Sequence, residues 1–371
     1  MPLRSDAPKR SCHPGCHVSR IGFHADVTTP SDRSAKDALI WGFDGGDEGS
    51  CLLIFSMHTP LVDEPMQEAQ MNDYRPEDNS GEIPPRVRRL VENRLEVIES
   101  VVYGTAVKAA LMPGKMLRTR LADRLAAANP SCPDLAVLVP VCAGIELVHA
   151  ASLCHDDVID NSWIRRSLPT VWRNTGCNGA ILLGDLLISE ALDLIGSVEK
   201  GAYLRAFIGK IREVCQAEAE AELRWRGRRA DEATCLRLAR YKTGPLFAFA
   251  ASVCGGHRQP LSGALEEAGY YIGTAYQLAD DLIDVTGNER TVGKTLGLDR
   301  SQRKYTLAQG SGQDRRRTRE RIRELCLSTL TCLKAHPHAR RAAGRFIARD
   351  LQPLLSLREG HLDIVCEEQS T

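Results

Sequence analysis

The pattern of apolar and polar positions divides the chain into two parts. Residues 1–80 show no sustained helical or strand period and are rich in Gly, Pro, Ser, Asp and His, which predicts a disordered extension or an over-long start. Beyond them, Val87, Val91 and Leu95 recur at helical spacing, and helical patterns continue almost to the end. Alternating strand patterns are nearly absent. We therefore expect an all-α domain over residues 81–365.

Composition narrows the class of protein. The chain has 371 residues, of which 43% are hydrophobic, so it can bury a large core. Lys plus Arg and Asp plus Glu both total 48, and the formal net charge is zero. Nothing global points to a nucleic-acid partner or an acidic membrane, so any anion site must come from local clustering. The longest early apolar run, Cys51–Phe55, is too short for a secretory signal or an integral membrane segment, which predicts a soluble cytoplasmic protein.

The pattern D-D-x-x-D occurs twice, each time at the end of an apolar helical run, as Asp156, Asp157 and Asp160 and as Asp280, Asp281 and Asp284. On a helix, carboxylates four residues apart share a face and repel each other, and apolar neighbours raise the cost of ionising them. A cation would offset both effects, and Mg²⁺ prefers a few carboxylates together with water and phosphate oxygens. A single copy would be read as a solvated helix end. Two copies, both followed by basic groups, favour a metal site that binds a diphosphate.

Basic and imidazole side chains follow or precede these motifs. One set comprises Lys115, Arg118, His149, Arg165, Arg166, Lys242, Lys294 and Lys304. Each alone is typical of a surface charge, but together they exceed what one phosphate group needs. We expect Lys242 and Thr243 to end a helix before Gly244-Pro245. The arginine-rich segments 224–229 and 315–317 lack partner motifs and are interpreted as solvated faces without a role.

The motifs, taken in order, resemble the trans-polyprenyl diphosphate synthase family over roughly residues 82–360. The series runs Gly114-Lys115-x-x-Arg118, His149, His155-Asp156-Asp157-x-x-Asp160, Arg165-Arg166, Gly184-Asp185, Lys242-Thr243, Gln277-x-x-Asp280-Asp281-x-x-Asp284, Gly293-Lys294 and Lys304-x-Thr306-Leu307. Departures include Thr119 where the family usually has Pro and Ser167 where Gly is common. The helix around residues 218–226 lacks the family's usual Q-G-E signature.

The resemblance implies a bundle of ten or more helices around a deep cavity, usually in a homodimer, with the two aspartate motifs facing each other. It implies head-to-tail condensation of isopentenyl diphosphate with an allylic diphosphate. About three Mg²⁺ ions would be held by the six aspartates. Arg165, Lys242 and Lys294, with Lys304 as a weaker candidate, would bind the allylic diphosphate. Isopentenyl diphosphate would be bound by Lys115, Arg118, His149 and Arg166, and Thr243 and Gln277 complete the substrate-binding set.

Product length depends on the residues four and five positions before Asp156. Both Ser152 and Ala151 are small, and the resemblance implies that an aromatic residue at one of these positions would stop growth at fifteen or twenty carbons. We therefore expect a geranylgeranyl or longer product, although Leu183 and Leu187 on a neighbouring helix could close the cavity instead.

Other interpretations of the chain remain open. A farnesyl diphosphate synthase would share every motif. A class I terpene cyclase would not need the second diphosphate site that Lys115 and Arg118 suggest. A non-catalytic subunit would not need two intact aspartate motifs. A structural bundle with chance acidic clusters would not place so many motifs in order.

Overall fold

The structure is a computed structural model that describes residues 81–102, 105–256, 259–287, 295–297, 304–309 and 311–354. The chain divides into two units, residues 1–75 and residues 76–371. The expectation of a disordered extension over residues 1–80 lies outside the described residues and stays a prediction. The described helices and strands all belong to the second unit.

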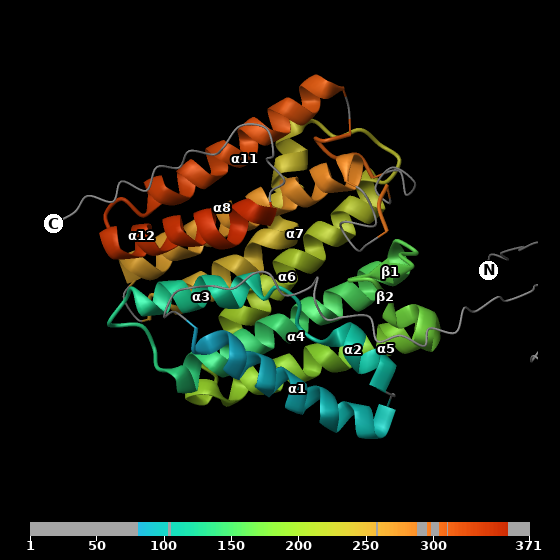
Figure 1. The fold of residues 1–371 in the computed structure, drawn as a ribbon, viewed down its shortest axis with the longest axis horizontal. Helices are drawn as coiled ribbons and strands as arrows, with labels where there is room; N and C mark the ends of the chain where they lie inside the picture. Colours follow the sequence, from blue (N-terminus) through green and yellow to red (C-terminus); the bar gives the residue numbers. More distant parts are fainter. Residues whose placement is uncertain are drawn as a thin grey trace, which may run out of the picture. The chain divides into compact units, whose positions relative to one another are not determined.

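The prediction of an all-α fold is confirmed, and ten α-helices lie in the described residues (Figure 1). They are α1 (Ile83–Val102), α2 (Thr105–Leu111), α3 (Leu117–Ala127), α4 (Leu135–Ile159), α5 (Val171–Ser197), α6 (Leu204–Glu220), α7 (Glu232–Val253), α8 (Gln259–Thr286), α11 (Gly312–Cys332) and α12 (Pro337–Phe346). Short 3₁₀ or π turns follow at Val198–Gly201, Ala221–Trp225, Ile347–Leu351 and Gln352–Leu354. The described extended structure is a small antiparallel hairpin of β1 (Ile164–Arg165) and β2 (Leu168–Pro169).

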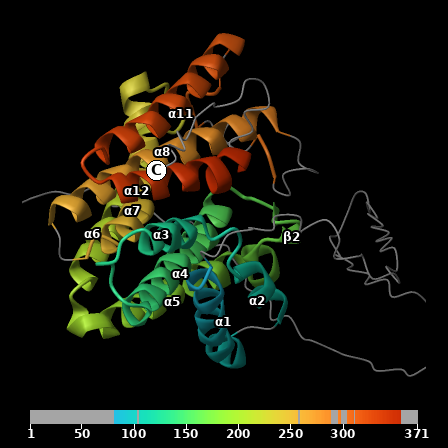
Figure 2. The ribbon, with the colours of Figure 1, turned by 60° about the vertical axis from the view of Figure 1, so that its left-hand side comes forward.

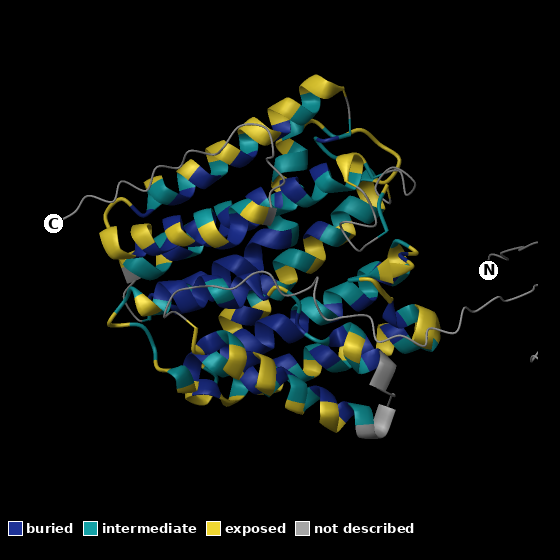
Figure 3. Ribbon diagram, in the orientation of Figure 1, coloured by how far each residue is buried: buried dark blue, intermediate teal, exposed yellow. Residues whose placement is uncertain are grey.

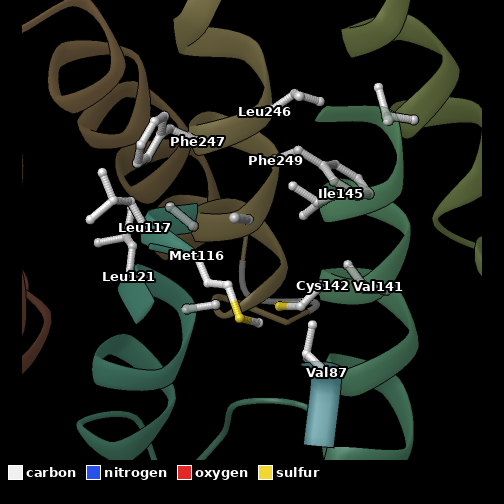
Figure 4. Packing of buried hydrophobic residues seen from close by; sticks show 14 of the residues in the cluster. Val87, Met116, Leu117, Leu121, Val141, Cys142, Ile145, Leu246, Phe247 and Phe249 are labelled. Carbon is white, nitrogen blue, oxygen red and sulfur yellow. The ribbon is translucent and has the colours of Figure 1, made fainter. Parts of the chain in front are cut away.

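Helices α4 and α5 pack against each other, as do α7 and α8, and α11 lies along α8 (Figures 1 and 2). Buried residues concentrate on the inward faces of these helices (Figure 3). In the close view of the core, Ile145 of α4 meets Phe249 of α7, and Leu117 of α3 lies near Phe247 (Figure 4). The apolar stripes that predicted the helices therefore face one another.

Helix α4 is the central apolar element. Over residues Leu135–Ile159 it is long and apolar enough to cross a membrane by length and composition, yet 72% of its apolar window is buried inside the protein. Burial on this scale is typical of a core helix. Its carboxyl end carries the first aspartate motif, so the core rigidly positions that motif.

The expectation that a helix ends at Lys242-Thr243 is wrong, because α7 continues through Gly244-Pro245 to Val253. Proline removes one helical hydrogen bond, but the residues that follow it are almost all buried, and their packing keeps the helix intact. Gly244 has a separate role: a Cβ placed on Gly273 of α8 would lie 2.6 Å from its Cα. The two backbones therefore touch, which fixes α7 and α8 in register immediately beside Lys242 and Thr243.

Candidate active site

The first aspartate motif occupies the last turn of α4. Asp156 and Asp157 lie inside the helix and Asp160 caps it, with its backbone N–H bonded to the carbonyl of Asp156 at 2.8 Å. Asp157 is only 3% exposed and accepts hydrogen bonds from Nε (3.1 Å) and Nη2 (2.8 Å) of Arg165. Burial raises the pKa of the Asp157 carboxyl, and the bonds from Arg165 partly offset that shift.

The second motif lies near the end of α8, where Gln277 donates to Oδ1 of Asp281 at 2.8 Å. Thr243 of α7 donates to Gln277, so the α7–α8 contact is connected to the aspartates by hydrogen bonds. Thr243 and Gln277 are therefore brought together, and their role in binding substrate stays a prediction.

Two cations lie within reach of both motifs. Burial opposes the charge of Arg165, but its bonds to Asp157 and the charges of Asp157, Asp156 and Asp280 together raise its pKa. Burial likewise opposes the charge of Lys242, and the pKa is nevertheless raised by negative charges that include Asp156 and Asp281. Because each cation interacts with an aspartate from α4 and one from α8, the two motifs share one electrostatic site.

The sequence analysis missed one residue of this site, Glu218 near the end of α6. Its Oε2 lies 3.1 Å from Nζ of Lys242. Burial raises the pKa of Asp156 to about 7, with the charge of Glu218 as the next largest cause. The segment Gln216-Ala217-Glu218 differs from the Q-G-E signature at the middle position, so the glutamate itself was the available signal.

Lys304 pairs with Asp160, which places this residue in the site although the sequence made it a weaker candidate. Lys294 lies outside the described residues, and its role stays a prediction.

The described part of the chain contains no preformed cluster of three His, Cys, Asp or Glu side chains that could hold a metal ion. The side chains of Asp157 and Asp160 instead form salt bridges with Arg165 and Lys304. The donor chemistry nevertheless fits Mg²⁺, because that ion takes one or two carboxylates and completes its shell with water and substrate phosphate oxygens.

A second group of cations surrounds a pocket between α2, α4 and the hairpin. Its lining includes Glu146, His149, Asp157, Arg165 and Arg166, together with apolar residues of α2 and α4. Burial, followed by the positive charge of Arg118 and of Arg166, lowers the pKa of His149 well below its usual value. The low pKa favours the neutral imidazole, which adds no positive charge to the pocket.

Arg118 lies buried beside this pocket, with 8% of its surface exposed and its guanidinium 4.9 Å from the ring centroid of Phe247. Within the described residues its Nε has no hydrogen-bond partner. A buried guanidinium N–H without an acceptor is costly, so the position is suited to an anionic ligand. Lys115 is exposed at the edge of the same loop and does not line the pocket.

The hairpin aims its two arginines at different places. Arg166 and Ser167 have φ values of 52° and 60°, the left-handed region that glycine adopts most readily. That geometry explains why glycine is common at the second of these positions. Arg165 points to Asp157, whereas Arg166 donates to the carbonyl of Met112 and packs against Gly114.

His155, immediately before Asp156, connects the first aspartate motif to α5. Its Nε2 lies 3.1 Å from the carbonyl oxygen of Ile181 and 3.4 Å from Oδ1 of Asp185. A Cβ on Gly184 would lie 2.3 Å from the same nitrogen, so only glycine leaves room for the ring. The Gly184-Asp185 motif therefore supports the first aspartate motif from the neighbouring helix.

The proposed chain-length residues face the core. Ala151 is fully buried, as is Leu187 of α5, and Leu183 is nearly so. Ser152 is half-buried and its hydroxyl donates to the carbonyl of His149 at 2.9 Å. Their effect on product length stays a prediction.

An all-α bundle with two aspartate motifs on a shared site, and a second cationic pocket beside it, defines a class I isoprenoid-synthase type of protein. The polyprenyl synthetase family model matches residues 100–333. The chain belongs to the polyprenyl synthetase family, which confirms the family resemblance seen in the sequence.

Individual relatives differ in their named products. The chain is 33% identical over 199 residues to a geranylgeranyl diphosphate synthase of Methanosarcina mazei, covering 51% of this chain and 61% of that protein. It is 36% identical over 203 residues to a (2E,6E)-farnesyl diphosphate synthase of Mycobacterium bovis, covering 52% and 55%. With heptaprenyl diphosphate synthase component 2 of Geobacillus stearothermophilus it shares 33% identity over 225 residues, covering 58% and 69%. The match therefore spans little more than half of the first two relatives.

Solved structures support the fold. A polyprenyl synthetase of Streptomyces coelicolor A3(2) is similar with a TM-score of 0.60 and 26% identity, covering 73% of this chain and 98% of that one. A polyprenyl synthase of Caulobacter crescentus gives a TM-score of 0.58 at 24% identity, covering 76% and 100%, and that likeness concerns the fold alone.

Proposed function

We propose that the chain catalyses head-to-tail condensation of isopentenyl diphosphate with an allylic diphosphate and releases pyrophosphate. The observation that carries the proposal is that basic and polar side chains connect to both aspartate motifs: Arg165 pairs with Asp157 at 2.8 Å, and Thr243, next to Lys242, donates to Gln277, which donates to Asp281. A site of this kind can bind a diphosphate between opposed acidic groups once Mg²⁺ is present. Family membership and the named products of the relatives support the same reaction class.

The first aspartate motif and the second would together hold Mg²⁺, about three ions by resemblance. The ion would supply Lewis-acid stabilisation of the negative charge on the departing pyrophosphate. Arg165 and Lys242 add fixed positive charge at the same place, and Lys304 lies beside Asp160. The allylic C–O bond breaks, the electron pair leaves with pyrophosphate, and an allylic carbocation remains.

The second diphosphate would bind beside Arg118, His149 and Arg166, with Lys115 at the edge of the loop. Neutral His149 can accept or donate one hydrogen bond without adding charge, and Arg118 offers an unpaired Nε–H. This site would hold isopentenyl diphosphate so that its double bond attacks the cation and forms the new C1′–C4 bond. The proton lost from C2 then passes to pyrophosphate, so no side-chain base is needed.

We further propose that the product is geranylgeranyl diphosphate or longer, because Ala151 and Ser152 leave the path along α4 open. A homodimer is the proposed assembly, from family resemblance, and the cytoplasm is the proposed location, from the short early apolar run. The relatives include farnesyl, geranylgeranyl and heptaprenyl synthases, so product length needs its own measurement.

The test uses the purified full chain, Mg²⁺, labelled isopentenyl diphosphate and a series of allylic primers, with the products sized by chromatography. We expect label in polyprenyl diphosphates of at least about twenty carbons, and no label transfer when Mg²⁺ is chelated. A hydrocarbon product without incorporated label would identify a cyclase instead. Turnover that requires an added second polypeptide would identify a subunit of a heteromer, and no turnover under either condition would refute the proposal.

A further inference from the structure

Two arginine-rich segments that the proposed reaction does not use converge at one end of the bundle. Segment 224–229 joins α6 to α7, and segment 315–317 lies in the first turns of α11. Nη2 of Arg317 lies 2.6 Å from Oε2 of Glu232, the first residue of α7, and Nε of Arg321 lies 3.0 Å from its other oxygen. The start of α11 is therefore held against the start of α7, directly after the first segment (Figures 1 and 2).

An electrostatic interaction also relates the two arginine-rich segments. Hydrogen bonds from Ser311 lower the pKa of Asp314, and the charges of Arg229 and Arg317 lower it further. We call the exposed arginines that share this end the basic surface. They are Arg224, Arg226, Arg228, Arg229, Arg316 and Arg317.

The basic surface gathers six exposed arginines at one end of a chain whose formal net charge is zero. Arg226, Arg316 and Arg317 have nearby carboxylates in Glu222, Glu320 and Glu232. Arg228 and Arg229, by contrast, form no salt bridge with any described residue. Exposed guanidinium groups gathered at one end of the bundle favour an extended anionic partner.

An apolar side chain stands in the middle of these charges. Leu223 is 85% exposed, the highest value among the large hydrophobic residues that the structure describes. Trp225 follows in the same π-helical turn, with the guanidinium of Arg224 5.5 Å from its ring centroid. The chain then leaves the helix at Arg226 and turns at Gly227, where φ is 75°, and residues 226–229 of this turn are exposed.

We propose that the basic surface binds the headgroup layer of an anionic lipid bilayer, with Leu223 and Trp225 inserted at the interface. Leucine and tryptophan among basic residues are typical of such surfaces, because lipid headgroups pair with the charges while acyl chains cover the apolar side chains. A nucleic acid would pair with the arginines and leave Leu223 in water. A shallow depression lined by Gly312, Gln313, Arg316, Arg317 and Glu320 adds room for a lipid phosphate.

The basic surface lies at the end of the bundle that carries the second aspartate motif. Cys235, in the first turn of α7, is close enough to Asp281 that the aspartate adds to the effect of burial in raising its thiol pKa. The basic surface therefore belongs to the same end of the bundle as the second aspartate motif. If the proposed function holds, a long-chain product leaves the site next to the bilayer, but the docking itself is independent of that activity.

The experiment measures co-sedimentation of the full chain with vesicles of phosphatidylcholine alone or mixed with phosphatidylglycerol, in the absence of substrates. We expect binding to the mixed vesicles only, with affinity falling as NaCl rises. Reversing Arg228→Glu and Arg229→Glu should weaken binding by at least roughly tenfold, and Leu223→Ser should weaken it by a few-fold. The matched control reverses Arg340→Glu and Arg341→Glu, an adjacent exposed pair on α12, and should bind like the wild type.

Several outcomes would overturn the proposal. They are equal loss in the control, unchanged binding in either test variant, and binding to duplex RNA or DNA without binding to vesicles. Light scattering gives a further check, because a lower mass in the Arg228→Glu, Arg229→Glu variant would make the basic surface a contact between subunits. Retained mass and helical circular dichroism, together with lost vesicle binding, would support docking on lipid.

Discussion

The imidazole of His155 occupies the space that any side chain at residue 184 would need, since a Cβ on Gly184 would lie 2.3 Å from its Nε2. His155 immediately precedes the first aspartate motif. The lack of a side chain at Gly184 on α5 therefore leaves room for the residue that leads into Asp156 and Asp160 on α4. The Gly184-Asp185 motif therefore contributes to the site through packing against His155.

Gly184→Ala should destabilise the fold by roughly 1–3 kcal/mol, because the added methyl overlaps the His155 ring and displaces it from its contacts with Ile181 and Asp185. It should also raise the Mg²⁺ concentration needed for half-maximal turnover, because His155 immediately precedes Asp156 of the first motif. Chemical unfolding and a Mg²⁺ titration measure the two effects. Gly263→Ala on α8, where a Cβ meets no atom within 4 Å, is the control and should not reduce stability. Equal behaviour of the two variants would contradict the packing role.

Asp156→Ala or Asp280→Ala should lower turnover by at least roughly a hundredfold, because a metal-held diphosphate contributes several kcal/mol to the transition state. The helical circular dichroism should stay intact. Asp193→Ala, which removes an exposed partner of Arg94 on the surface, should retain full activity. Near wild-type turnover in both motif variants would refute the metal assignment.

Lys115→Ala and Arg118→Ala should weaken binding of isopentenyl diphosphate more than binding of the allylic substrate. Each removes a charge-assisted contact of about 1.5–3 kcal/mol, so the KM for isopentenyl diphosphate should rise by roughly tenfold or more. Steady-state kinetics with each substrate varied in turn separates the two effects. Arg89→Ala, an exposed arginine of α1, is the control. Equal loss for both substrates would mean that the sites are assigned the wrong way round.

Ala151→Phe should shorten the main product by one or more five-carbon units. The residue is fully buried on α4, one turn before the first motif, so a phenyl ring there would fill the path of the growing chain without touching the aspartates. Chromatography of the products measures the shift, and turnover with the shortest primer should be retained. An unchanged product distribution, or a wild type that stops at farnesyl diphosphate, would contradict this path.

Local features of the site could be predicted from the sequence, whereas contacts between distant helices could not. The spacing of Asp156 and Asp160 places them on one helix face by geometry alone. Glu218 was missed because its partner, Lys242, belongs to another helix and only the tertiary packing brings them together. No local signal assigns that pair.

The helix end expected at Lys242-Thr243 failed for a related reason. Gly244 and Pro245 are strong local breakers, but the buried run after them and the close approach of Gly273 favour an uninterrupted helix. In the sequence, the arginine-rich segments looked like isolated solvated faces for a similar reason. Their convergence depends on Glu232, which meets arginines of α11 that lie far away in the chain.

The unpaired Nε of Arg118 has a consequence for inhibitor design. A compound that presents a phosphonate or carboxylate oxygen to this nitrogen would form a charge-assisted hydrogen bond without displacing any protein acceptor. The ring of Phe247 already holds the guanidinium in place, so little side-chain entropy is lost on binding. A compound anchored at Arg118 in this way would bind through the protein alone and would not need a metal ion.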